Sequence, residues 1–176
     1  MNKISGNNDF IWKGVNLCRQ EPFDLEDVVG VLRGVRGRTV DTVYDLYFTD
    51  RRIIAAILIH PSDFNDIYGK IDLTTLVFGN FPKQRAVKMR SLNLIESRRS
   101  AFANKTVEEI LALHRANLEI DYENVAYVTV RKGLLTKSLE FGVKNPPGKK
   151  ANFSLGDDQI AEAEELVRKV LPGKAK

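Results

Sequence analysis

The sequence predicts one α+β domain, in which antiparallel strands pack against a C-terminal amphipathic helix and are interrupted by a helical insertion. Short segments of alternating apolar and polar residues, separated by turn-forming residues, are typical of strands. The stretch 83–117 is instead rich in Lys, Arg, Ala, Leu and Met, which favour helix. The residues after Asp158 carry an apolar stripe at helical spacing. The chain has 176 residues, enough to bury the core of one such domain over 1–176.

The first part of the chain predicts β-structure. Residues 10–17 and 28–33 are two candidate strands, and the second leads into a glycine-spaced basic stretch, 34–38. The spacing of these glycines does not match a dinucleotide- or phosphate-binding loop, and no helix is predicted after them. They therefore indicate strand bulges or a bend in a tightly curled sheet.

A β-hairpin is predicted over residues 43–59. Period-2 alternation places three side chains of its first strand on one face: Tyr44, Leu46 and Phe48. The polar residues 49–52 predict a tight turn, and the continuous apolar run 53–59 predicts a second strand that is buried on both faces. Two strands joined by a short polar turn are expected to pair as a hairpin.

An insertion, 60–117, separates this hairpin from the remaining strands. Residues 60–82 are punctuated by proline and glycine and predict irregular structure. Residues 83–103 predict a helix, although their apolar positions do not form one clean stripe. Thr106 is followed three residues later by Glu, a capping box that predicts a helix over 107–116.

The chain returns to strands after the insertion and ends in a helix. Residues 118–120 and 125–130 flank a polar turn, and two further strands are expected at 135–143 and 151–155. The final helix begins after an acidic turn, carries basic residues near its end, and stops before a Pro-Gly pair. Its apolar stripe consists of Ile160, Ala163, Val167, Val170 and Leu171.

Two segments have a distinctive order of residues. Residues 44–54 read as an aromatic strand, Thr-Asp-Arg-Arg and an apolar strand, and residues 117–133 read as strand, turn and strand. Both resemble segments of prokaryotic pleckstrin-homology-like (PH/GRAM-like) proteins, although Asp121 stands where many of those have proline. The resemblance implies a seven-stranded antiparallel barrel or sandwich with the C-terminal helix, over about residues 28–171 and interrupted by 60–117. It implies no particular ligand or activity.

The formal net charge of +4 originates in the insertion. Between residues 83 and 105, seven basic residues stand against one acid, so this segment carries +6 and the other 153 residues together carry −2. A strongly basic segment of this kind attracts polyanions. The candidate anion- or partner-binding residues are Lys83, Arg85, Lys88, Arg90, Arg98 and Arg99 in the insertion, and Lys149 and Lys150 in a second basic loop.

These features favour a non-enzymatic binding module that contacts anionic lipid headgroups, or an acidic partner protein, through its basic insertion. A nucleic-acid-binding protein is an alternative, although interleaved aromatic residues for base stacking are missing. Two further interpretations remain open: a solvated face that keeps the protein soluble, and a homo-oligomer whose interface uses Leu94, Ile95 and Phe102.

Catalytic signatures are weak, so no catalytic residue, cofactor or metal site is predicted, and an enzyme of unknown reaction is only an alternative. His60, Asp63 and Asp66 lie within seven residues. A turn in which the carboxylates cap the backbone is favoured over a metal or general-base site. No Gly-x-Ser-x-Gly motif is present. His114 is expected to be partly buried on the apolar side of its helix.

The sequence favours a cytoplasmic protein. Its one cysteine, Cys18, cannot form an intramolecular disulfide, which fits a reducing compartment. The N-terminal residues lack the apolar stretch of a signal peptide. The longest apolar run, 53–59, is much shorter than the roughly 20 residues that a membrane-spanning helix needs.

Overall fold

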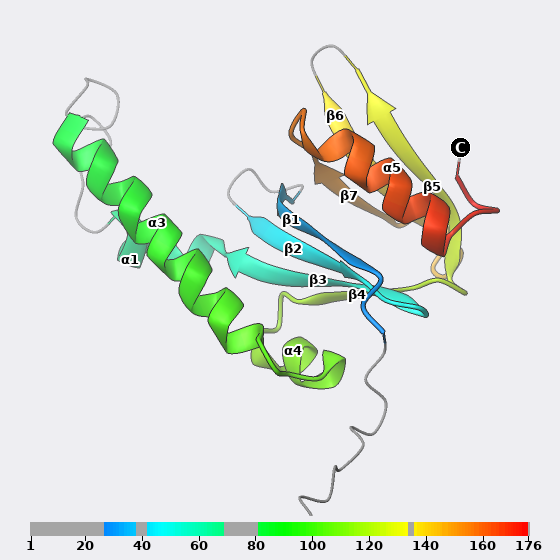
Figure 1. The fold of residues 1–176 in the computed structure, drawn as a ribbon, viewed down its shortest axis with the longest axis horizontal. Coiled ribbons are helices and arrows are strands. Elements are labelled where there is room, and N and C mark those ends of the chain that lie inside the picture. Colours follow the sequence, from blue (N-terminus) through cyan, green and yellow to red (C-terminus); the bar gives the residue numbers. More distant parts are fainter. Residues whose placement is uncertain (1–26, 38–41, 69–80, 134–135, 176) are drawn as a thin grey trace, which may run out of the picture.

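The computed structural model describes residues 27–37, 42–68, 81–133 and 136–175, the side chains of 81–84 excepted. It shows the α+β class that the sequence predicts, with a seven-stranded antiparallel sheet and, in the described residues, four α-helices (Figure 1). The strands are β1 Gly30–Arg36, β2 Val43–Phe48, β3 Arg52–Ile59, β4 Leu118–Asp121, β5 Val125–Lys132, β6 Lys137–Val143 and β7 Lys150–Ser154. The helical elements are the 3₁₀ turn η1 Pro61–Asp63 and the helices α1 Phe64–Tyr68, α3 Phe81–Phe102, α4 Val107–Leu113 and α5 Gln159–Val170.

The sheet runs in the order β4-β3-β2-β1-β7-β6-β5. Strand β1 joins its two halves, because it pairs with β2 along most of its length and with β7 at one position, Arg36 opposite Ser154. Helix α5 lies across both halves and contacts β1 and β5 (Figure 1). Among the described strands no ladder joins β4 to β5, so the sheet has two ends. The closed barrel that the resemblance implies is therefore not confirmed.

Two apolar clusters lie on opposite faces of the β2–β3 hairpin. The larger one is covered by α5 and includes Leu46, Phe48 and Ile53. The smaller one is covered by α3 and α4, and its buried members are Ile54, Ala56, Leu58, Phe102, Val107 and Ile110. Strand β3 contributes alternate residues to both clusters, which confirms that the apolar run 53–59 is a strand buried on both faces.

The structure of β1 agrees with the prediction that the glycines near the start of the sheet mark a strand bulge. Strand β1 begins at Gly30, two residues later than predicted, and the preceding Val28 and Val29 are exposed. The β1–β2 register shifts between Leu32 and Val35, around Gly34, whose φ of +69° lies in the left-handed region. This is a β-bulge at a position that favours glycine. The candidate strand 10–17 and Cys18 lie outside the described residues.

The insertion is more regular than predicted. The prediction of irregular structure over 60–82 is wrong in part, because η1 and α1 occupy 61–68 and α3 already begins at residue 81. Both prolines stand where a helix tolerates them. Pro61 is the first residue of η1, which a reciprocal capping box between His60 and Asp63 supports, and Pro82 is the second residue of α3. A helix leaves the N–H groups of its first turn without an intrahelical partner, so proline removes no bond there.

Helix α3 confirms the helix predicted over 83–103, and α4 begins where the capping box predicts. The Thr106 hydroxyl accepts from the Glu109 N–H at 3.2 Å, and the Glu109 carboxylate accepts from the Thr106 N–H at 2.8 Å. The helix ends at Leu113 rather than at residue 116, because His114 is extended with φ −152° and ψ 132°. Strands β4 to β7 and α5 confirm the remaining predictions, with ends shifted by one or two residues.

Candidate functional site

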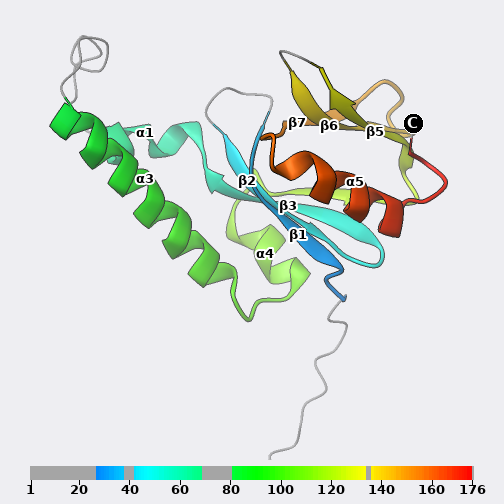
Figure 2. The same ribbon diagram turned by 45° about the horizontal axis from the view of Figure 1, so that its top comes forward.

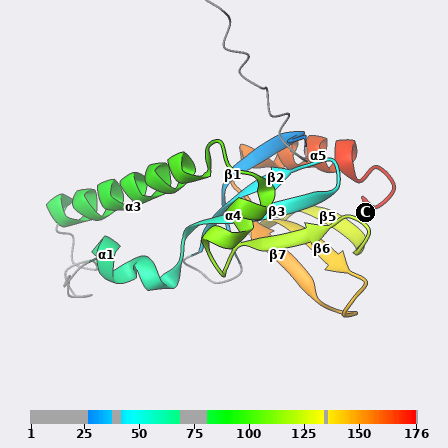
Figure 3. The ribbon, with the colours of Figure 1, turned by 90° about the horizontal axis from the view of Figure 1, so that it is seen from below.

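Helix α3 carries six of the seven basic residues of segment 83–105 and is only partly attached to the sheet. Its C-terminal part packs on β3, whereas its first turns extend past the end of the sheet beside α1 (Figures 2 and 3). The basic residues are therefore divided between a base that contacts the fold and an arm that leaves it. Here "the base" means residues 94–105 and "the arm" means residues 81–93.

The base is held by a buried ion pair between α3 and β2. The Asp45 side chain is 1% exposed, and its two carboxylate oxygens accept from Arg99 Nε at 2.8 Å and Arg99 Nη2 at 3.0 Å. The N–H of Gly34, in the β1 bulge, also donates to Asp45 at 2.7 Å. The hydrogen bond to Asp45 raises the pKa of Arg99, so this guanidinium remains charged. Arg99 therefore joins α3 to the centre of the sheet.

A second ion pair holds the next face of the base. Arg98 donates to both carboxylate oxygens of Asp63, at 2.8 and 2.9 Å, and to the carbonyl of Leu58 at 3.1 Å. Asp63 also accepts from the N–H of His60 at 2.7 Å, so one carboxylate caps η1 and binds α3. Lys105 lies 3.9 Å from Glu109. The last three basic residues of the predicted segment are thus paired with acids of the same fold.

The arm differs because its cations face solvent. Arg85, Lys88 and Arg90 are exposed and have no ion pair with a described residue; Arg90 reaches only the carbonyl of Ile67, at 3.4 Å. Met89 and Leu92 are 51% and 44% exposed. Lys83 belongs to the same helix, but its side chain lies outside the described part. The arm therefore presents positive charge without compensation from any described acid.

The exposed face of the arm has a regular composition. Positions i, i+3, i+4 and i+7 share one side of a helix. Arg85, Lys88, Met89 and Leu92 have this spacing, and all four side chains are exposed. We call these four residues the arm face. It combines two cations with two flexible apolar side chains.

Lys149 and Lys150 are not brought to the arm. They lie at the β6–β7 turn, at the end of the molecule away from α3 (Figures 1 and 2). Lys150 lies 3.0 Å from Glu140, whose side chain is 7% exposed, and the Tyr127 hydroxyl also donates to Glu140. The hydrogen bond to Glu140 raises the pKa of Lys150, and the hydrogen bonds from Lys150 and Tyr127 lower the pKa of Glu140. Both lysines are exposed, but Lys150 is part of a charged network on the sheet, whereas Lys149 has no ion pair with a described residue.

The His60, Asp63 and Asp66 segment acts as a capped turn, as the sequence favours. Its first two residues form the capping box of η1, and Asp63 binds Arg98. The ring centroids of His60 and His114 lie 5.1 Å apart. Among the described residues, no group of three or more His, Cys, Asp and Glu side chains is placed to hold a metal ion.

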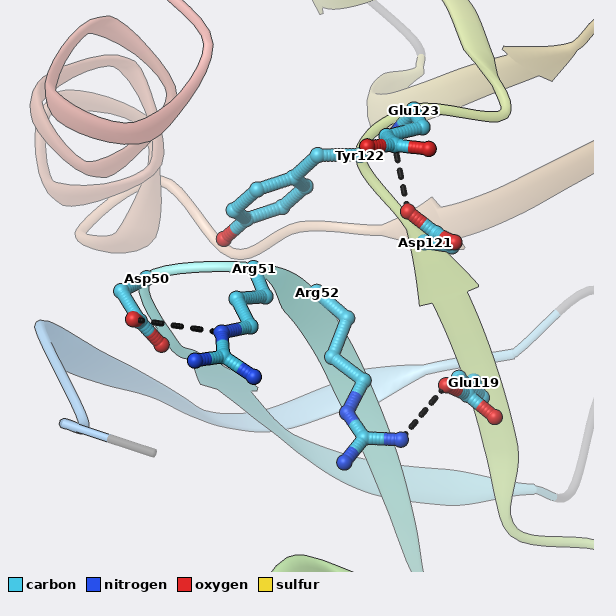
Figure 4. A pocket seen from close by; sticks show the side chains of 7 residues that line it. All are labelled: Asp50, Arg51, Arg52, Glu119, Asp121, Tyr122 and Glu123. Carbon is cyan, nitrogen blue, oxygen red and sulfur yellow. Dashed lines mark hydrogen bonds and ion pairs between the residues drawn. The ribbon is translucent and has the colours of Figure 1, made fainter. Parts of the chain in front are cut away.

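A cleft of about 550 Å³ lies between the β2–β3 and β4–β5 turns (Figure 4). It is lined by Asp50, Arg51, Arg52, Glu119, Asp121, Tyr122 and Glu123. Several of these groups bind one another: Arg52 donates to Glu119 at 2.7 Å, and Asp121 accepts from the Glu123 N–H. The Tyr122 hydroxyl donates to the carbonyl of Thr49, which lies outside the lining. Several charged groups of the lining are therefore bound to one another rather than free for a ligand.

Sequence reasoning overlooked Asp45, the acid that fixes the base. A local signal exists, since this acid stands inside an apolar strand, between Tyr44 and Leu46. A charge at such a position needs a partner, because burying an unpaired carboxylate is costly. The sequence does not identify that partner, which is 54 residues away.

None of the helices in the described ranges is long and apolar enough to cross a membrane. Comparison of the chain with protein-family models, with curated proteins and with solved structures finds no match.

Proposed function

We propose that this chain is a non-catalytic binding module, with a pleckstrin-homology-like fold, that attaches to anionic lipid surfaces through the arm of α3. One observation carries the proposal. The basic residues of the base are paired with Asp45, Asp63 and Glu109, whereas Arg85, Lys88 and Arg90 of the arm have no ion pair with a described acid. Charges needed only for folding or docking would resemble the first group.

The fold proposal rests on the seven antiparallel strands followed by a C-terminal amphipathic helix. Helix α5 buries Ala163, Leu166 and Val167 against the sheet, as the resemblance implies. An experimental structure that places β7 beside β1 and α5 over both halves supports this assignment. One that separates the two halves into unrelated layers contradicts it.

The charge of the arm suits weak, reversible attachment. A Lys or Arg near an anionic leaflet contributes about 1 kcal/mol, so Arg85 and Lys88 of the arm face supply about 2 kcal/mol together. That corresponds to a factor of roughly 30 in the binding constant. Met89 and Leu92 lie on the same face and add apolar contact with the interface. Attachment is therefore expected to be strong only at low ionic strength.

An anionic membrane is favoured over nucleic acid for a specific reason. Single-stranded nucleic acid binds to basic grooves with exposed aromatic rings. Phe102, the one aromatic residue of α3 whose side chain is described, is 6% exposed and belongs to the smaller core cluster. The arm face instead offers thioether and leucine side chains, which suit acyl chains and headgroups.

Co-sedimentation with vesicles tests the proposal. The wild-type chain is expected to pellet with phosphatidylserine-containing vesicles at low salt and to remain in solution with neutral vesicles. Arg85→Glu/Lys88→Glu is expected to abolish pelleting, because it replaces two attractions with two repulsions, a change of about 4 kcal/mol.

The matched control reverses two exposed cations elsewhere, Arg115→Glu/Lys149→Glu, with the same change in net charge. It is expected to keep most of the binding. An equal loss in both double variants would show that net charge, and not the arm, attracts the chain. A shift of DNA or RNA at low salt, with no vesicle binding, would favour the nucleic-acid alternative.

A further inference from the structure

A separate, partly enclosed cleft with a largely apolar lining lies where the base of α3 meets the sheet. Its volume is about 330 Å³, within the range of small-molecule sites. Strands β1 to β3 form one wall, and the end of α3, the 103–105 turn and α4 form the other. We call it the α3–α4 cleft.

The floor of the α3–α4 cleft is hydrocarbon. Ile54, Phe102, Val107 and Ile110 line it, and all four belong to the smaller core cluster. Val28 stands at the cleft and is 51% exposed, a large fraction for valine. An apolar chain in the cleft would extend the packing of this cluster and cover Val28.

The rim of the cleft is cationic. Arg33, Arg99 and Lys105 line it together with one acid, Asp45. That acid is already bound by Arg99 and by the Gly34 N–H, so it leaves little acceptor capacity for a ligand. Among its charged groups the lining therefore offers donors rather than acceptors, which favours an anionic group.

Two of the donors are available. Arg33 is exposed, and its guanidinium has no ion pair with a described residue. Tyr47 is half-buried in the lining, and its hydroxyl bonds to no described group. Burial raises the pKa of this hydroxyl, which keeps it protonated as a donor. A carboxylate accepts from donors of both kinds.

We propose that the α3–α4 cleft binds a fatty-acid carboxylate, with the chain on the Ile54–Ile110 floor and the head group against Arg33 and Tyr47. The combination of an apolar floor with a mostly cationic rim fits a single-chain amphiphile with an anionic head group better than a neutral polar metabolite. The site is distinct from the arm face, so its occupancy does not depend on the proposed membrane attachment.

Titration of the full chain with laurate, below its micellar concentration, tests the site. Isothermal calorimetry is expected to show saturable binding of one laurate per chain. Acetate is expected not to bind because it lacks the chain, and dodecanol is expected to bind at least tenfold more weakly because it lacks the charge. Tenfold corresponds to about 1.4 kcal/mol.

Arg33→Ala is expected to weaken laurate binding about tenfold, since it removes a charge-assisted contact. Arg33 is exposed and unpaired within the described structure, so the variant should fold, which circular dichroism verifies. The matched control is Arg115→Ala, an exposed arginine outside the cleft. Equal affinity for laurate and dodecanol, equal loss in both variants, or no saturable binding by the wild type would each overturn the proposal.

Discussion

The Asp45–Arg99 pair provides the sharpest test of how α3 is attached. Asp45→Ala removes a carboxylate that accepts two hydrogen bonds from Arg99 and one from the Gly34 N–H. Removing one partner from a fully buried ion pair costs about 3–5 kcal/mol, because the other charge is left without compensation. The Arg99 side chain is 24% exposed, so water can compensate part of its charge. We therefore expect a smaller cost, about 2–3 kcal/mol.

Urea unfolding followed by circular dichroism measures this free-energy cost, and thermal unfolding measures the corresponding change in melting temperature. For a chain of this length, 1 kcal/mol corresponds to a change of about 2–4 °C in melting temperature, so Asp45→Ala is expected to lower Tm by about 4–12 °C. Hydrogen exchange should accelerate most at the base of α3. The α5 side of the sheet, which belongs to the larger cluster, should change less.

The matched control is Glu96→Ala. Glu96 also pairs with Arg99, at 3.2 Å, but its side chain is 69% exposed. Exposed pairs contribute about 0–1 kcal/mol, so this variant should be close to wild type. If Asp45→Ala is no more destabilising than Glu96→Ala, then the buried pair does not fix the base, and the division of α3 into base and arm is wrong.

Two further predictions concern pH and the β1 bulge. Partial burial, followed by the proximity of His60 and Arg98, lowers the pKa of His114, so the unfolded chain binds this proton more tightly than the folded chain. The stability that neutral His114 contributes should be fully present above about pH 6.5 and be lost as the pH falls below that value. His114→Gln should therefore reduce the dependence of the melting temperature on pH between about pH 7 and 5.5, and an unchanged dependence would contradict this. Gly34→Ala should cost about 1 kcal/mol in denaturant unfolding, because φ is +69° there although a Cβ would meet no atom within 4 Å. Gly173→Ala, equally open but without positive φ, should be neutral, and equal effects of the two substitutions would refute the backbone argument.

The elements that sequence predicts well are those with a strong local cause. The run 53–59 is apolar throughout because β3 faces two clusters, and its pattern alone indicates double burial. The Thr106 and Glu109 capping box places the start of α4 at the correct residue. The Pro-Gly pair and the apolar stripe likewise define α5. In each case, neighbours in sequence supply most of the interactions that fix the element.

The features that sequence did not predict depend on contacts between distant residues. Basic residues occur in both parts of α3, yet Arg98 and Arg99 are bound to acids of the fold whereas Arg85 and Lys88 are exposed. The difference arises from where Asp45 and Asp63 lie in space, which local pattern does not encode. The α3–α4 cleft has the same origin, because its lining comes from three strands and two helices.

Hydrogen exchange with and without phosphatidylserine vesicles tests the central claim most directly, because it locates the contact on the chain. The account predicts slower exchange in the arm, residues 81–93, on anionic vesicles at low salt and no change on neutral ones. The base should be unaffected, since Arg98 and Arg99 are already bound to Asp63 and Asp45. Protection confined to the β6–β7 turn around Lys149, or equal on both kinds of vesicle, would contradict the assignment of α3 as the anion-binding element.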